Sequence, residues 1–284
     1  MRSNQLLPES TILGAVTLWV ADLDSMIRFY RVGVGLDLIA HEGSHAILGF
    51  KTREILILEA KREMKYASPH EAGLFHTAIL FPTESALARS VYSVATKYSG
   101  NFTGSADHLV SKAFYFDDPE GNGVELYWDR DRSEWSWVHG SVEMDTIYLD
   151  PNQFLKENLT NEEVDQEKQV GHVHLSVGSI EAAEDFYVKM LGFEKTLNWG
   201  GQALFVSAGG YHHHMAMNTW KSRGAGKRRL ALGLGNVRIH LDSTDQVSEV
   251  ADRLEFHQLD FEVDAQRVQV RDPWDNLITL SPRS

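Results

Sequence analysis

The chain lacks cysteine altogether, and this absence excludes several kinds of chemistry. Without thiols there is no disulfide, no thiolate nucleophile and no cysteine-ligated zinc or iron–sulfur centre. A metal site in this protein must therefore use histidine or oxygen donors. The N-terminal residues also lack a long apolar segment followed by a small-residue cleavage site, so no signal peptide is expected. Both absences favour a cytoplasmic protein.

Long apolar runs and an excess of basic residues are also missing. No stretch approaches about 18 consecutive apolar residues, so no transmembrane helix and no membrane partner are expected. The formal net charge of −13, from 40 acidic and 27 basic residues, disfavours a nucleic acid as partner. The 284 residues, 43% of them hydrophobic, suffice for one large or two smaller domains.

An internal repeat is present instead. The segment from Val16 to Ile39 aligns without a gap with the segment from Val173 to Thr196. Each has an alternating apolar run, a polar turn, a helical stretch with Phe-Tyr, and a closing glycine. A second, weaker pair, "HTAILFPTESALARSVYSVATKYSGNF" and "NVRIHLDSTDQVSEVADRLEFHQLDF", is typical of strand, turn and amphipathic helix. Both halves then end in an Asp-Pro phrase, "DDPEGNGVELYW" or "RDPWDNLITLSP", which predicts a hairpin leading into a strand.

These repeats predict an α+β protein built from four β-α-β-β-β modules. The modules, numbered 1 to 4 along the chain, are expected at residues 12–61, 74–130, 170–220 and 232–282. The first two would form an N-terminal domain at 12–130 and the last two a C-terminal domain at 170–282. Residues 131–169 between them are interpreted as a linker or an excursion from the fold.

The tandem module, with "FY" before the glycine and "DP-x-G-x-x-x-E" before the last strand, resembles the vicinal oxygen chelate superfamily. Glyoxalase I, bleomycin- and fosfomycin-resistance proteins and extradiol ring-cleaving dioxygenases belong to it. The phrases "DHLVSKAFYFDDPEGNGVELYWDR", "GHVHLSV" and "GGYHHHMAMNTW" are similar to bacterial catechol-2,3-dioxygenases of the four-module kind. The resemblance implies that modules pack in pairs and that their mixed sheets curl into two cups. A metal sits inside a cup, held by residues of first and last strands.

The repeat allows each module to be compared at these ligand positions. Modules 2 and 3 carry ligand-type residues there: His76, Glu125 and His172. Modules 1 and 4 do not: they carry Ala15, Asn236 and Thr279. Two histidines and one carboxylate leave a face of an octahedral metal open, as in non-heme Fe(II) oxygenases. Fe(II) is the expected metal. Mn(II) is an alternative, and Zn(II) or Ni(II) would fit a protein that is not a dioxygenase.

The three residues can share one cup only if module 2 packs on module 3 and module 1 on module 4, and this pairing is predicted. His174 competes with His172 as a ligand, because residues two apart on a strand share a face. Each candidate ligand has an ordinary alternative, as a packed histidine or an exposed strand residue.

The resemblance also implies catalytic residues. His213 corresponds to a histidine that acts as acid and base, Tyr115 to a tyrosine that hydrogen-bonds the substrate or an oxygen intermediate, and His108 to a histidine that bonds the substrate oxygen. His213 belongs to the run His212–His214, interpreted as part of a strand with one histidine facing the metal. The alternative for each is a core side chain. The nearby aromatic residues are candidates for lining an apolar pocket or for plain core: Phe114, Trp128 and Trp220.

The expected function is therefore an Fe(II)-dependent extradiol dioxygenase of aromatic catabolism. It would open a catechol-type ring with O₂, and its partners would be a small aromatic diol and possible copies of itself in a homo-oligomer. One alternative is a glyoxalase-like isomerase or lyase. That reaction requires a second carboxylate in the site as the base. The candidate, Glu59, lies at the end of module 1 and so outside modules 2 and 3. The other alternative is a non-catalytic binding or resistance protein.

Overall fold

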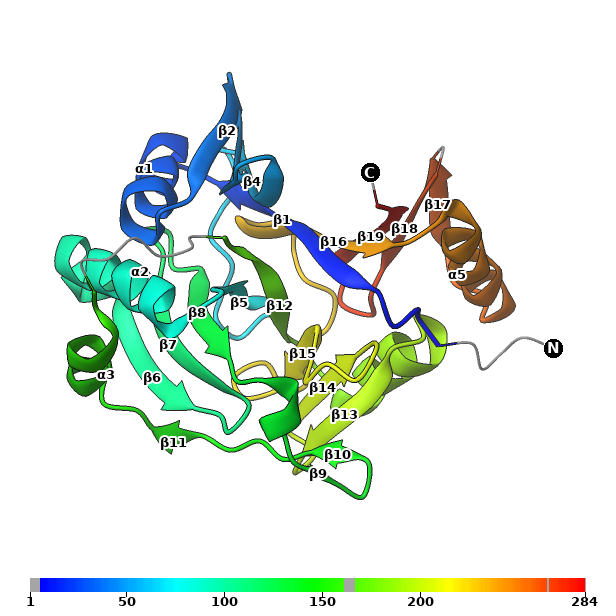
Figure 1. The fold of residues 1–284 in the computed structure, drawn as a ribbon. Coiled ribbons are helices and arrows are strands. Elements are labelled where there is room, and N and C mark those ends of the chain that lie inside the picture. Colours follow the sequence, from blue (N-terminus) through cyan, green and yellow to red (C-terminus); the bar gives the residue numbers. More distant parts are fainter. Residues whose placement is uncertain (1–5, 161–166, 265, 284) are drawn as a thin grey trace. The chain divides into compact units, whose positions relative to one another are not determined.

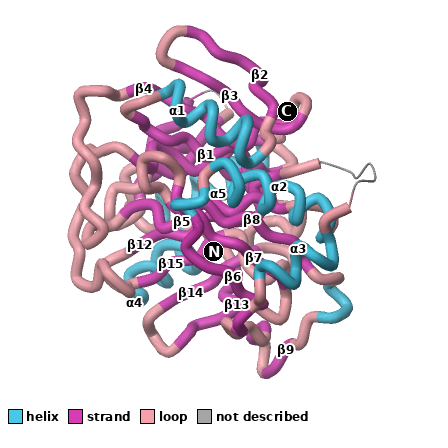
Figure 2. Tube along the Cα trace, turned by 90° about the vertical axis from the view of Figure 1, so that its left-hand side faces the viewer, coloured by secondary structure: helices cyan, strands magenta, loops and turns pink. Residues whose placement is uncertain are grey.

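The computed structural model describes residues 6–160, 167–264 and 266–283. The chain divides into two compact units, each with two of the predicted modules. The N-unit comprises residues 17–64 and 76–171, and the C-unit comprises residues 1–16, 65–75 and 172–284. Strands predominate and helices are few (Figure 2). The predicted α+β class of curled mixed sheets is thereby confirmed, whereas the predicted domain limits and module pairing stay predictions.

The N-unit contains modules 1 and 2 (Figure 1). Module 1 has the strand order β2-β3-β4-β1, from β1 (Ile12–Val20), β2 (Asp37–Glu42), β3 (His45–Phe50) and β4 (Arg53–Ala60). Module 2 has the order β6-β7-β8-β5, from β5 (Gly73–Leu80), β6 (Phe102–Asp107), β7 (Ser111–Asp117) and β8 (Gly123–Asp129). The first strand of each module therefore lies beside the last, and in module 2 these two strands run parallel.

The C-unit repeats the same plan in modules 3 and 4. Module 3 has the order β12-β15-β14-β13, from β12 (Gln169–Ser176), β13 (Glu194–Trp199), β14 (Ala203–Ser207) and β15 (Met215–Asn218). Module 4 has the order β17-β18-β19-β16, from β16 (Gly233–Leu241), β17 (Phe261–Asp264), β18 (Arg267–Arg271) and β19 (Leu277–Pro282). First and last strands are again parallel.

Each module carries its helix on one face of its sheet. In modules 2 and 4 the helices α2 (Glu84–Lys97) and α5 (Thr244–Phe256) begin at Thr83 and Ser243, whose hydroxyls accept a backbone N–H of the first turn. Alternate residues of β16 are buried on the side of α5, where Val237 and Ile239 pack. The candidate site residues of module 2 lie on the opposite face of their sheet, beside a small apolar cluster.

The Phe-Tyr helices of modules 1 and 3 are not regular α-helices throughout. Helix α1 (Leu23–Arg28) continues as a π-helix, η1 (Phe29–Val34), and α4 (Ile180–Ala183) continues as η4 (Glu184–Met190). The wide turn falls on Phe-Tyr in both copies and directs both rings into the core, where they are buried. The periodicity that predicts a helix does not distinguish these two forms.

One buried hydrogen bond joins the two modules within each unit. Tyr30 donates its hydroxyl proton to Asp118 at 2.9 Å in the N-unit, and Tyr187 donates to Asp272 at 3.0 Å in the C-unit. Each aspartate directly precedes the proline of its Asp-Pro hairpin, and all four side chains are buried. Burial raises the pKa of Asp118 to about 6, although four hydrogen bonds to its carboxylate act in the opposite direction.

Residues 131–169 are more than a linker. The described part contains η3 (Arg132–Glu134), β9 (Trp137–Val138), β10 (Ser141–Val142), β11 (Ile147–Tyr148) and α3 (Pro151–Asn158). Strand β11 pairs antiparallel with β6 and extends the sheet of module 2. On α3, Phe154 packs its ring 4.8 Å from that of Phe114. The segment therefore docks on module 2, and Phe114 is a core residue. Within the described residues, no helix is long and apolar enough to cross a membrane.

Candidate functional site

Two of the predicted metal ligands lie side by side in the sheet of module 2. His76 is on β5 and Glu125 is on the parallel neighbour β8. His76 Nε2 lies 2.9 Å from Glu125 Oε2, and both side chains are buried. Two donor atoms that each bind one ion at about 2.1 Å are separated by about 3 Å, so this spacing fits shared ligation. It also fits a plain buried His–Glu pair, which satisfies the carboxylate without a metal.

Tyr115 and His108 extend this pair into a chain of polar contacts. Tyr115 is directly opposite Glu125 in the register of β7 and β8. Burial raises the pKa of Tyr115 well above its usual value, and the charge and hydrogen bond of Glu125 raise it further. His108 Nε2 lies 2.6 Å from the Tyr115 hydroxyl, and its Nδ1 lies 2.7 Å from the backbone carbonyl of Asp145.

The backbone carbonyl of Asp145 determines which nitrogen of His108 carries the proton. A carbonyl only accepts, so His108 carries a proton on Nδ1. When His108 is neutral, its bare Nε2 competes with the Glu125 carboxylate for the single Tyr115 proton. The contacts of the N-unit thus run from Asp145 through His108, Tyr115 and Glu125 to His76, and they bring four predicted site residues together. Asp145 could not be predicted from the sequence, because it acts through its backbone carbonyl, which every residue type has.

A small apolar cluster lies directly beside this polar row on the same face. Ala78 and Tyr127 follow His76 and Glu125 by two residues each, and Ala113 precedes Tyr115 by two. Tyr127 is fully buried.

The remaining predicted residues lie in the C-unit. His172 on β12 and His213 are both buried, and their ring centroids are 4.1 Å apart. His213 Nδ1 lies 2.7 Å from His212 Nδ1. His174, the competing ligand, has Nε2 3.0 Å from Asn218 Nδ2 and an edge contact with the partly exposed ring of Trp220. Of the two histidines on β12, His172 is therefore the one whose ring packs against His213.

The run His212–His214 does not lie in a strand, and that expectation is wrong. Strand β15 begins only at Met215. Gly209 and Gly210 both have positive φ, 63° and 65°, and they turn the chain so that the histidines follow a loop. Faces do not alternate along such a loop, and all three side chains are buried. His214 Nδ1 accepts the backbone N–H of Ala208 at 3.2 Å.

Module 4 shows what replaces the polar row where the ligands are absent. Asn236, Thr279 and Gln269 stand in the positions of His76, Glu125 and Tyr115. Thr279 donates to Asn236 at 3.1 Å and accepts from Gln269 at 3.2 Å. Neutral groups thus satisfy one another in module 4.

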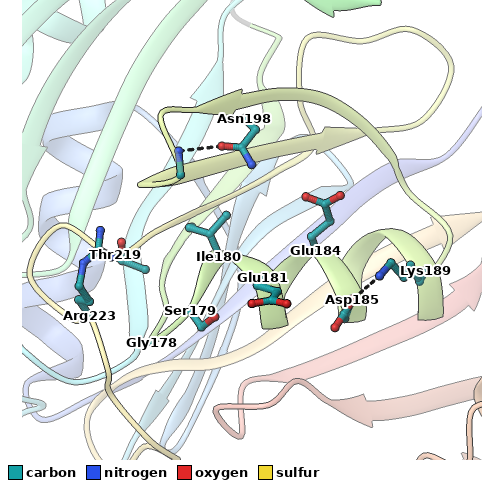
Figure 3. A pocket seen from close by; sticks show the side chains of 11 residues that line it. Gly178, Ser179, Ile180, Glu181, Glu184, Asp185, Lys189, Asn198, Thr219 and Arg223 are labelled. Carbon is teal, nitrogen blue, oxygen red and sulfur yellow. Dashed lines mark hydrogen bonds and ion pairs between the residues drawn. The ribbon is translucent and has the colours of Figure 1, made fainter.

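A surface pocket of about 540 Å³ lies elsewhere in the C-unit (Figure 3). It is lined by the start of α4, by η4, by Asn198 near the end of β13 and by the loop that carries Arg223. Its charged residues include both signs, and Asp185 pairs with Lys189 at its edge. None of the predicted site residues lines it, so it is separate from the polar rows described above.

Comparison with known proteins agrees with this arrangement of modules. Residues 12–126 and 169–280 match the model of the glyoxalase/bleomycin resistance protein/dioxygenase superfamily, and the chain belongs to this superfamily. It is 32% identical over 277 residues to a catechol-2,3-dioxygenase of Bacillus subtilis strain 168, covering 93% of this chain and 95% of that protein.

Solved structures share the fold at low sequence identity. A presumed dioxygenase of Bacillus subtilis subsp. subtilis strain 168 superposes with a TM-score of 0.69 at 13% identity, covering 98% of this chain and 86% of that one. Glyoxalase I of Zea mays superposes with a TM-score of 0.61 at 15% identity, covering 96% and 92%. Because members with different reactions share this fold, the fold does not decide between them.

Proposed function

We propose that this protein is a metal-dependent extradiol dioxygenase that opens a catechol-type ring with O₂. The observation that carries the proposal is the row of His76, Glu125, Tyr115 and His108, in which two buried side chains of metal-ligand type adjoin a partly buried hydroxyl and imidazole. The similarity to a catechol-2,3-dioxygenase over nearly the full length of both chains supports the same reaction.

The proposed metal ligands are His76, Glu125 and His172, three buried side chains of the types that bind Fe(II). Further support comes from Gly171, the residue before His172. A Cβ on Gly171 would lie 1.6 Å from the Tyr127 hydroxyl, so only glycine allows this approach. Tyr127 is two residues beyond Glu125, so Gly171 lies close to the strand that carries Glu125.

Fe(II) is the proposed metal, with Mn(II) as an alternative, because two imidazoles and one carboxylate leave open positions for substrate and O₂. When bound, the metal would chelate the two vicinal oxygens of the diol and allow electron transfer from ring to O₂. The chain's own residues bind and orient the diol and move its protons. A small aromatic diol is accordingly the proposed substrate.

The proton-handling residues are proposed from their contacts. His213, whose ring packs on His172, would accept a proton from the diol and return it later, as a neutral imidazole near pH 7 can. Tyr115 has a single hydroxyl proton, which would turn from His108 Nε2 to a substrate oxygen when the diol binds, and His108 would hold the hydroxyl in place until then. Burial keeps the Tyr115 phenol protonated, because its pKa is raised, so it acts as a donor.

The glyoxalase-like alternative lacks a free second carboxylate at Glu59. That carboxylate accepts from Trp19 Nε1 at 3.2 Å and pairs with Lys61 at 3.3 Å. No observation on the described residues favours this alternative over ring cleavage.

The proposal is tested by anaerobic loading with Fe(II), metal analysis, and exposure to O₂ with a panel of catechols. We expect about one iron per chain and a yellow ring-opened product. Glu125→Gln should abolish both iron retention and product. The matched control is Thr279→Ser, because Thr279 is the module 4 counterpart of Glu125, and it should leave both unchanged. Stoichiometric iron without product from any diol would refute the dioxygenase, and it would leave a binding protein or an isomerase.

A further inference from the structure

We propose that His212 is a positioning residue that fixes the tautomer of His213. In this arrangement His213 carries its proton on Nδ1 and gives it to His212 Nδ1 in a hydrogen bond. The Nε2 atom of His213 is then left as an acceptor. The choice of His213 as the donor rests on the proposed function, whereas the requirement that the two rings have opposite tautomers rests on their distance alone.

The distance between the two rings restricts their protonation. Two Nδ1 atoms only 2.7 Å apart cannot both carry a proton, and they cannot both be bare without repulsion. One ring must donate and the other must accept. The two neutral histidines therefore have opposite tautomers, and the state of His212 sets the state of His213. A base that takes a proton from a diol needs a bare Nε2, which requires the proton of His213 on Nδ1.

His212 is held firmly enough to impose this choice. Its side chain is fully buried. Its backbone carbonyl accepts the hydroxyl proton of Thr196 at 2.7 Å, from a buried position on the adjacent β13. The ring of Tyr211 covers its ring at a centroid distance of 4.1 Å. With its backbone anchored by Thr196 and its buried ring covered by Tyr211, His212 acts on His213 as a stationary acceptor.

The three consecutive histidines His212–His214 therefore have three different roles. His213 packs against His172, the proposed ligand, with a ring distance of 4.1 Å. His212 orients His213 from behind. His214 uses its Nδ1 to accept the Ala208 N–H and closes the turn made by Gly209 and Gly210. This division gives each of the three consecutive histidines a separate role just before β15, where the His214 backbone is already hydrogen-bonded to Val206 and Val173.

The tautomer is measured directly by ¹⁵N NMR of the metal-free full chain labelled at histidine, with His213 assigned by its loss in His213→Gln. We expect a protonated Nδ1 and a bare Nε2 on His213. His212→Asn retains an acceptor near the Nδ1 position and should preserve this state. His212→Phe removes the acceptor and should produce a mixture of tautomers or the Nε2–H form. His214→Asn is the matched control and should leave the His213 signal unchanged.

The kinetic test uses the Fe(II)-loaded protein and a catechol. His212→Phe should lower kcat by about tenfold or more, because a general base in the wrong tautomer is ineffective. The KM should stay within about twofold, and His212→Asn should recover most of kcat. A wild-type His213 with its proton on Nε2 would overturn the proposal without any variant. An unchanged tautomer and kcat in a folded His212→Phe would do so as well. If the wild type opens no catechol, the proposed function fails, and the NMR result still decides the tautomer.

Discussion

Asp118 should make the protein less stable as pH rises, and this prediction can be worked out from the structure. Its carboxyl is buried in the Asp-Pro hairpin, where burial raises the pKa from 3.8 to about 6. The folded state therefore holds the proton more tightly than the unfolded state does. The stabilising contribution is fully present below about pH 4 and is lost as pH rises through about 6.

The magnitude follows from the size of the shift. One pKa unit corresponds to about 1.4 kcal/mol, so the shift from 3.8 to about 6 corresponds to a loss of about 3 kcal/mol. About 2 kcal/mol of this loss falls between about pH 4.5 and pH 7.5. That is a large fraction of the stability of an ordinary domain.

The test compares the wild type with Asp118→Asn by urea unfolding across this pH range. The amide keeps an oxygen for the backbone N–H groups of Glu120 and Asn122, both at 2.9 Å, and does not ionise. The difference between the two proteins removes the titration of all other groups. We expect the wild type to lose about 2 kcal/mol relative to the variant as pH rises.

A flat difference, or a wild type that gains stability with rising pH, would refute the reasoning. Either result would mean that the donors around the carboxylate outweigh its burial. The deciding donors are the side-chain amide of Asn122, the backbone N–H groups of the hairpin and the Tyr30 hydroxyl, which favour the ionised form.

Three further predictions concern the paired modules and the proposed metal site. Tyr187→Phe removes one donor from buried Asp272 and should lower the unfolding free energy by about 1–3 kcal/mol in urea titrations; no change would contradict a structural role for this bond. A saturating divalent metal at about 100 times its Kd should raise stability by about 2.7 kcal/mol, seen as a higher Tm. Glu125→Gln should lose that increase, and an equal increase in this variant would place the metal elsewhere. Gly171→Ala should cost about 1–3 kcal/mol, because its Cβ meets the buried Tyr127 hydroxyl, and it should also weaken metal retention; tight metal retention in the alanine variant would argue against His172 as a ligand.

The order of strands and helix within a module could be predicted from the sequence, because the same pattern occurs four times along the chain. Alternating apolar runs gave the strands, and the two Asp-Pro phrases predicted hairpins that are present as β7–β8 and β18–β19. His76 and Glu125 could also be predicted, since the ligand positions implied by the resemblance recur in each module, whereas Tyr115 was predicted from the resemblance alone. Comparison of modules therefore did what no single motif could do.

Other features escaped the sequence for physical reasons. The path of His212–His214 was mistaken for a strand, because two left-handed glycines outweigh the apolar pattern that follows them. The docking of residues 131–169 depends on edge pairing and on the ring of Phe154, which are tertiary contacts without local periodicity. The acceptor on Asp145 is a main-chain atom, and any residue could supply it.

The tyrosine–aspartate bond that joins neighbouring modules occurs in both units. One partner comes from the first module of the unit and the other from the second. A single module cut from its neighbour would present an unpaired phenol or an unpaired carboxyl, together with the apolar surface around it. The smallest fragment that can fold alone should therefore be two consecutive modules. A duplicated pair of modules would contain its own tyrosine–aspartate bond, whereas a duplicated single module would not.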